Sequence, residues 1–350
     1  MTVKDTGATF AGLIDLAAEE MGGKALATSD DFFAEMQNLL KPGRGIFLPD
    51  EYTDRGKWMD GWESRRKRED GYDTCIVKLG VRGVIRAVDI DTNHFLGNHP
   101  PFASLEATSA SDSASAAELA NAKWVELVPQ SPLRPGSQNL FAVALQSDSY
   151  THVRLHIYPD GGVARMRIWG SADPDWSRVD ADESTRPLLK SGEVDLASVR
   201  NGALALACSD AFFGPMNNLI APGRAANMGG GWETRRKRLP GNDWILVRLG
   251  APGEIELVEI DTNHFKGNFP DRFALRGIHA PDAQITDLIA LSSYAKEPAW
   301  QTAIPETKLR ASERHFFRND VKNKGPFTHL RLDVFPDGGI SRLRVWGKRS

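Results

Sequence analysis

Cysteine is nearly absent from this chain of 350 residues, which contains only Cys75 and Cys208. The two are not spaced as metal ligands are, so we expect neither a disulfide framework nor a cysteine-based zinc site. Such sparse cysteine usage favours a reducing, cytoplasmic setting. Cys208 aligns with Thr28 in the internal repeat described below, which excludes a thiol nucleophile common to both copies.

Long apolar runs and an excess of positive charge are also missing. No stretch of about 18 uninterrupted apolar residues is present, so we expect no membrane-spanning helix. The N-terminal residues lack the charged, apolar and small-residue order of a secretory signal. The formal net charge of −3 argues against general attraction to nucleic acid or to an anionic membrane.

The chain contains two copies of one sequence unit. Residues 15–44 align without gaps with residues 195–224, and 17 of the 30 positions are identical. By composition alone, about one position in fifteen would match. Three more motifs recur in the same order: GWESRRKR (61–68) as GWETRRKR (231–238), VDIDTNHFLGNHP (88–100) as VEIDTNHFKGNFP (258–270), and HVRLHIYPDGGVARMRIWG (152–170) as HLRLDVFPDGGISRLRVWG (329–347). We therefore expect two homologous domains, residues 1–170 and 194–350, joined by a polar linker at residues 171–193.

The motif regions have the pattern of an all-β fold. Val153, Leu155 and Ile157 alternate with Arg154 and His156, and a Pro-Asp-Gly-Gly turn follows. Short strands between turn signals predict a jelly-roll β-sandwich in each repeat. The segments before the GWE motif, residues 30–44 and 210–224, are expected to run in short turns and 3₁₀ pieces.

The GWE(S/T)RRKR motif is the first candidate for chemistry. A lone RRKR is typical of an exposed basic run, but here a Trp-Glu pair precedes it in both copies. Arginine binds a carboxylate through two parallel hydrogen bonds, so Arg65 and Arg235 are candidates for substrate binding. Glu63 and Glu233 could hold these arginines or act as a base. In a continuous strand, Glu63 and Arg65 would share one face and Arg66 would lie on the other.

The (D/E)IDTNHFxGN motif places ionisable and amide side chains within eight residues. An amide can both donate to and accept from a urea-like group, and histidine exchanges a proton near neutral pH. The alternative is a loop stabilised by Asx turns, whereas a metal site is a weaker interpretation because two ligands do not complete a shell. The candidates are Asp91, Asn93, His94 and Asn98 in the first copy and Asp261, Asn263, His264 and Asn268 in the second.

The RxRxWG return strand supplies the third candidate set. Arg167 and Arg344 point away from the apolar face of that strand. They could simply be solvated. Placed beside a strand rich in aspartate, they could also line an anion-binding concavity.

The three motifs, duplicated in this order, resemble the allantoicase family from about residue 12 to residue 347. The resemblance implies two jelly-roll domains related to galactose-binding-like modules and the hydrolysis of allantoate to ureidoglycolate and urea in allantoin degradation. No cofactor is expected, while a role for a divalent metal and the formation of a homo-oligomer stay open. The copies depart from each other at His99 and Phe269, at Leu96 and Lys266, and at Asp89 and Glu259, which leaves open whether both carry equal sites.

Releasing intact urea requires an acid for the departing nitrogen and a base for water or the remaining ureido group. We assign that proton transfer to His94 or His264, with Glu63 or Glu233 as alternative or partner, and the orientation of the ureido arms to the Asp and Asn side chains. A sugar-binding module is the rival hypothesis, but it would favour exposed aromatics over repeated ionisable and amide groups. Whether a site lies within a domain, between domains or between subunits stays open.

Overall fold

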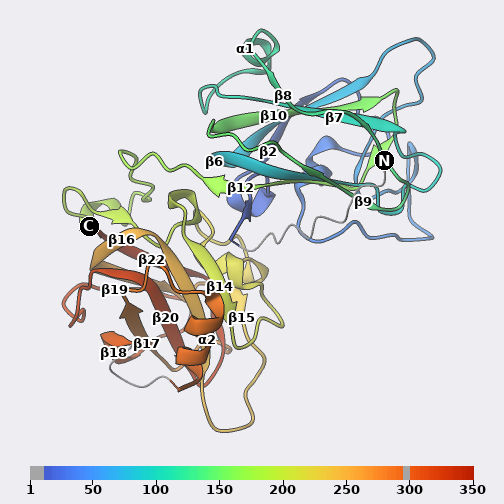
Figure 1. Ribbon diagram of the computed structural model, residues 1–350. Helices are drawn as coiled ribbons and strands as arrows, with labels where there is room; N and C mark the ends of the chain where they lie inside the picture. The colour runs from blue at the N-terminus through green and yellow to red at the C-terminus, as the bar shows by residue number, and fades with distance from the viewer. Residues whose placement is uncertain (1–11, 295–299) are drawn as a thin grey trace. The chain divides into compact units, whose positions relative to one another are not determined.

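Strands form nearly all of the regular structure in the computed structural model, which describes residues 12–294 and 300–350. The chain divides between Asp173 and Pro174 into two units (Figure 1), whose strands follow the same order except that the first unit has an additional pair, β3 and β4. The first unit contains β1 (Ile14–Asp15), β2 (Lys24–Thr28), β3 (Tyr52–Thr53), β4 (Gly56–Lys57), β5 (Trp62–Glu63), β6 (Asp73–Asp91), β7 (Phe102–Thr108), α1 (Ala116–Ala120), β8 (Val125–Pro132), β9 (Gln138–Ala142), β10 (Tyr150–Tyr158), β11 (Gly162–Val163) and β12 (Arg165–Ala172). The second contains β13 (Val194–Asp195), β14 (Leu204–Cys208), β15 (Trp232–Glu233), β16 (Asp243–Asp261), β17 (Arg272–Ile278), α2 (Ile285–Tyr294), β18 (Gln301–Lys308), β19 (Arg314–Phe317), β20 (Phe327–Phe335), β21 (Gly339–Ile340) and β22 (Arg342–Arg349).

Each unit is a jelly-roll sandwich in which one long strand belongs to both layers. The first half of β6 pairs with β2 and β10, and its second half pairs with β12 and β9. One layer is therefore β2-β6-β10-β7-β8 and the other is β1-β12-β6-β9. In the second unit, β16 pairs in the same way with β14 and β20 and then with β22 and β19. The expected all-β fold with two homologous sandwiches is confirmed.

The core lies between the layers and is built from the alternating apolar residues. Val153, Leu155, Ile157, Met166 and Ile168 are all completely buried. This burial confirms the period of two read from the sequence.

The outer face of β12 is also covered, because a 3₁₀ turn at Met36–Leu40 and the residues after it lie across the strand. Arg167 is half-buried there and donates hydrogen bonds of 2.6 Å to the carbonyl oxygens of Lys41 and Gly43. The second unit has its equivalent 3₁₀ turn at Met216–Ile220. The 3₁₀ pieces expected before the GWE motif are thus confirmed.

Helices play a minor part. A capping box between Ser115 and Glu118 begins α1, and Leu288 of α2 packs with Leu246 and Trp300. Within the described ranges, no helix has both the length and the apolar character needed to span a membrane.

Candidate active site

The GWE motif anchors one side of a cleft in the first unit. Trp62 is completely buried, and its indole nitrogen donates to the backbone oxygen of Asp30 at 2.8 Å. Strand β5 ends at Glu63, so the expected alternation of faces through Arg66 is wrong. Because the chain is irregular after two strand residues, every residue from Glu63 to Arg68 lines the same cleft.

A glutamate and an asparagine from different motifs meet in this cleft. Asn98 Nδ2 donates to Glu63 Oε1 at 2.7 Å, and in the second unit Asn268 Nδ2 donates to Glu233 Oε1 at 2.5 Å. Burial raises the pKa of the Glu63 carboxyl above its ordinary value, and the hydrogen bond from Asn98 offsets part of that rise. A buried carboxyl with a raised pKa in a cleft is a candidate general acid.

The cleft has a volume of about 1030 Å³, enough for a small molecule and ordered water. Four consecutive basic side chains line it, together with the turns around Gly97 and Gly161. Its lining residues are Phe33, Glu63, Ser64, Arg65, Arg66, Lys67, Arg68, Gly97, Asn98, His99, Pro101, Pro159, Asp160 and Gly161.

The predicted substrate-binding arginine of this motif is already engaged by the protein. Arg65 Nε donates to Asp30 Oδ2 at 2.6 Å, and its guanidinium carbon lies 5.2 Å from the centre of the Phe32 ring. In the second unit, Asp210 and Phe212 hold Arg235 in the same way. Arg65 therefore shapes the wall of the cleft, and its Nε is not free for a ligand.

Two arginines that the sequence interpretation passed over are better placed for an anion. Arg66 and Arg68 are exposed, line the cleft and have no acceptor within the described part of the chain. Lys67 between them pairs with Asp73 at 2.6 Å. The run of four basic residues was visible in the sequence, but the assumption of a strand assigned Arg66 to the wrong face.

The three motifs meet at Phe95. A Cβ atom added to Gly162 would lie 2.0 Å from the Phe95 ring, and one added to Gly61 would lie 2.8 Å from it. The Gly162 amide also donates to the backbone oxygen of Asn98 at 2.8 Å. Gly61 of the GWE motif and Gly162 of the Pro-Asp-Gly-Gly turn thus leave room for Phe95. The loop that carries Asn98 can therefore approach Glu63.

A second polar cluster contains the other predicted residues of the DTNHF loop. Asp91 accepts from Arg44 Nε at 2.8 Å and from Arg44 Nη2 at 2.9 Å. Asn93 donates to the backbone oxygen of Gly45 at 2.8 Å, and the ring of His94 stacks on Phe47 at 5.6 Å. His94, with a left-handed φ of 68°, is not among the residues that line the Glu63 cleft.

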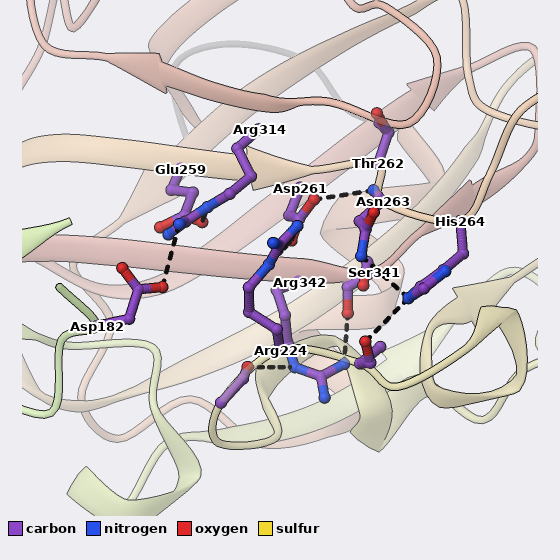
Figure 2. Close-up of polar contacts among 12 residues, drawn as sticks. Asp182, Arg224, Glu259, Asp261, Thr262, Asn263, His264, Arg314, Ser341 and Arg342 are labelled. Atoms are coloured by element: carbon purple, nitrogen blue, oxygen red, sulfur yellow. Dashed lines mark hydrogen bonds and ion pairs between the residues drawn. The ribbon is translucent and has the colours of Figure 1, made fainter. Parts of the chain in front are cut away.

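Figure 2 shows the equivalent cluster of the second unit. Arg224 lies beside Asp261 at 3.3 Å, and His264 Nε2 lies 2.9 Å from the backbone oxygen of Ala225. Arg314 lies between Glu259 and Asp182, at 2.7 Å and 3.1 Å. The predicted residues thus fall into two groups in each unit. The first group contains the glutamate of the GWE motif, the basic run and Asn98 or Asn268. The second contains the aspartate, the histidine and Asn93 or Asn263 of the DTNHF loop.

The arginines of the return strand belong to this second group, where Arg344 is buried and Arg167 is largely covered. Backbone carbonyl oxygens accept from Arg167, and Arg344 likewise donates to those of Ala221 and Gly223. Arg344 lines a cavity of about 240 Å³ together with Asp261. Solvation is therefore not their role, and much of their donor capacity is used by the protein.

Asp89 is a titratable group that the sequence interpretation did not select. Burial raises its pKa to about 6, and Gln138 Nε2 donates to one of its oxygens at 2.7 Å. In the second unit Glu259 stands at this position, with Arg314 in place of Gln138. The periodic pattern alone would have shown that Asp89 shares a face with Asp91. Within residues 12–294 and 300–350, no three acidic, histidine or cysteine side chains are grouped as metal ligands.

Comparison with known proteins identifies the family. The allantoicase repeat model matches residues 14–173 and again residues 194–350. A probable allantoicase 1 of Burkholderia mallei is 45% identical over 334 residues, which cover 95% of this chain and 94% of the relative. A probable allantoicase of Pseudomonas fluorescens is 44% identical over 348 residues, covering 99% and 100%. The crystal structure of allantoicase from Saccharomyces cerevisiae superposes with a TM-score of 0.77 at 34% identity, over 96% of this chain and 93% of that chain. The chain belongs to the allantoicase family.

Proposed function

We propose that this chain is an allantoicase, a hydrolase that converts allantoate and water into ureidoglycolate and urea. The relatives named as probable allantoicases cover nearly the whole chain, including both repeats. In this reaction the bond from the central carbon to one ureido nitrogen breaks, and an oxygen from water takes its place. The two free cysteines, one of them buried, support a reducing cytoplasm as its setting.

The observation that carries the proposal is the Glu63–Asn98 pair in a cleft with free arginines. Allantoate has one carboxylate and two ureido groups on a single carbon. Arg66 and Arg68 would bind the carboxylate, and the Asn98 amide would orient a ureido arm. The same cleft has room for the substrate and for a water molecule beside it.

We assign the proton transfer to Glu63 and, in the second repeat, to Glu233. The protonated carboxyl would donate its proton to the nitrogen of the departing urea. The resulting carboxylate would then take a proton from the water that adds to the central carbon, which returns the group to its starting state. Burial raises the pKa of Glu63 above its ordinary value, which favours the protonated form that this step requires.

The second cluster remains an alternative location for part of this chemistry. His94 and His264 carry the same kind of proton-exchanging group, and Asp91, Asn93 and their counterparts could orient a ureido arm. Against a leading role, the amide of Asn93 already donates to Gly45, and Asp91 is already paired with Arg44. We therefore rank this cluster second.

The test is urea release from allantoate by the purified chain, with and without prior chelator treatment. We expect release in both samples, and loss after chelation would instead establish a metal requirement. The double variant Glu63→Gln with Glu233→Gln should lower kcat by roughly 100-fold or more, the usual contribution of a general acid–base group.

The matched comparison is the double variant His94→Gln with His264→Gln. If the histidine variant loses turnover while the glutamate variant retains it, the proton-transfer role moves to the histidines. If the folded wild type binds allantoate in calorimetry but releases no urea, the chain is a binding module and the proposed reaction is refuted.

A further inference from the structure

The two Glu–Asn clefts differ in the segment that precedes the GWE motif. Sixteen residues, 45–60, separate Arg44 from Gly61 in the first repeat, and six residues, 225–230, occupy that place in the second. The longer segment forms the β3–β4 hairpin, and Arg55 of this hairpin donates to the backbone oxygen of Phe32 at 3.1 Å. The next residue, Phe33, lines the first-repeat cleft.

In the second repeat, the shorter segment carries Met228, whose thioether contacts the equivalent Asn–Glu pair. Asn268 Nδ2 lies 3.3 Å from Met228 Sδ, in addition to its hydrogen bond with Glu233. Glu233 is only 9% exposed, whereas Glu63 is half-buried and its partner Asn98 is exposed. The polar pair is therefore more open to a ligand in the first repeat.

The clefts also differ in one ionisable group. His99 directly follows Asn98, is half-buried and lines the first-repeat cleft together with Glu63. Its Nδ1 atom is buried without a hydrogen-bond partner in the part of the chain that the structure describes. His99 thus brings to the cleft an imidazole, the side chain that most often serves as a general acid in enzymes. Phe269 stands at this position in the second repeat and cannot exchange a proton.

We propose that His99 is a catalytic residue of the first-repeat cleft and that turnover depends on this cleft. The inference rests on the proposed hydrolysis of allantoate. His99 in its protonated form donates a proton to the departing urea nitrogen as the carbon–nitrogen bond breaks, and the Glu63 carboxylate takes a proton from the water that adds to carbon. Proton exchange with solvent then restores both groups. Two groups thus divide the acid and base steps that Glu63 would otherwise perform alone.

The variant His99→Phe tests this directly, because it installs the side chain that the second repeat already has. We expect kcat for urea release to fall at least 100-fold with a much smaller change in KM. Phe269→Leu, a change of similar character at the second-repeat position, should retain the wild-type rate. Thermal unfolding of both variants checks that the chain still folds.

A chemical-rescue measurement separates catalysis from packing. Imidazole added to His99→Ala should restore part of the lost kcat. The rescue should occur only at pH values where the added imidazole is protonated, since the protonated form donates the proton. A merely structural histidine would not respond in this way.

The inference would be overturned if the wild type releases urea and the His99→Phe variant keeps about half of that rate or more. The second repeat would then work without a histidine. Loss without any rescue by imidazole would also overturn the catalytic role. A folded wild type that releases no urea would instead refute the proposed function itself, so the two failures are distinguishable.

Discussion

Two buried aspartates of the first repeat, Asp60 and Asp89, have opposite pKa shifts because their hydrogen-bond partners differ. Asp60 forms an ion pair of 2.7 Å with Arg165, and both are almost fully buried. Burial by itself would raise the pKa of Asp60, but the hydrogen bonds from Arg165 and from the Ile46 amide bring the pKa below its ordinary value. Asp89 has an amide partner instead, and one of its oxygens is buried without a partner among the described residues. Its pKa is consequently raised to about 6 by burial.

Replacing Asp89 with Asn should stabilise the fold at alkaline pH. Because the pKa is about 6 in the folded protein and 3.8 in the reference state, the folded form binds the proton more tightly. This group favours folding below about pH 4, and the contribution is lost as the pH rises through 6. Ionised Asp89 therefore costs about 3 kcal/mol at pH 8. Asp89→Asn should raise the free energy of unfolding in guanidinium by about 1–3 kcal/mol at pH 8 and have little effect at pH 4.

The matched control is Asp60→Asn, another buried aspartate in the same unit. It leaves Arg165 buried without its counter-charge and should destabilise the chain at pH 8 by about 3–5 kcal/mol. Equal effects of the two substitutions, in sign and in pH dependence, would contradict this account of the buried charges.

At the scale of elements, the short β5–β11 pairing holds the cleft together. Gly162 pairs with Glu63, and its amide binds the loop that carries Asn98. Phe95 fills the space below this pairing and is completely buried. A two-residue ladder has little stability of its own, so the position of Glu63 depends on how closely Phe95 packs.

Gly162→Ala should therefore damage both stability and turnover. The added Cβ would lie 2.0 Å from the Phe95 ring, which requires the ring or the turn to shift. We expect a loss of about 1–3 kcal/mol in the free energy of unfolding, together with a lower rate of urea release. Gly97→Ala is the stability control, since a Cβ there meets no atom within 4 Å. A Gly162→Ala chain as stable as Gly97→Ala would show that Phe95 does not constrain the turn.

At the scale of the whole molecule, the segment between the repeats belongs structurally to the second unit. Glu193 is 1% exposed and accepts from Arg318 at 2.7 Å and 2.9 Å. Asp182 from the same segment pairs with Arg314 beside Glu259. The second compact unit accordingly begins at Pro174, within the polar segment expected to be a linker.

Glu193→Gln in the full chain should show how much this attachment contributes. Burial would raise the pKa of Glu193, but the hydrogen bond from Arg318 lowers it below its ordinary value, so the ionised form is favoured in the folded state. The substitution should cost about 1–3 kcal/mol, measured by chemical denaturation at pH 7, because Arg318 loses its ionised hydrogen-bond partner. Glu313→Gln removes the partner of the exposed Arg310 and should change nothing measurable. If the two variants are equally stable, the segment is only loosely attached.

The amino-acid sequence alone determined the duplication, the all-β class, the turns and the family. These properties are carried by local periodicity and by residue identity, both of which can be read along the chain. The alternation around Val153 and Leu155 predicted their burial correctly because side-chain direction in a strand depends only on position.

Tertiary structure alone decided which candidate side chains meet. Asn98 and His94 are four residues apart, yet the first contacts Glu63 and the second stacks on Phe47, since the loop turns around the buried Phe95. Arg66 rather than Arg65 is left without an acceptor, because Asp30 from a distant segment binds Arg65. Such partners depend on long-range packing, and no local pattern in the sequence specifies them.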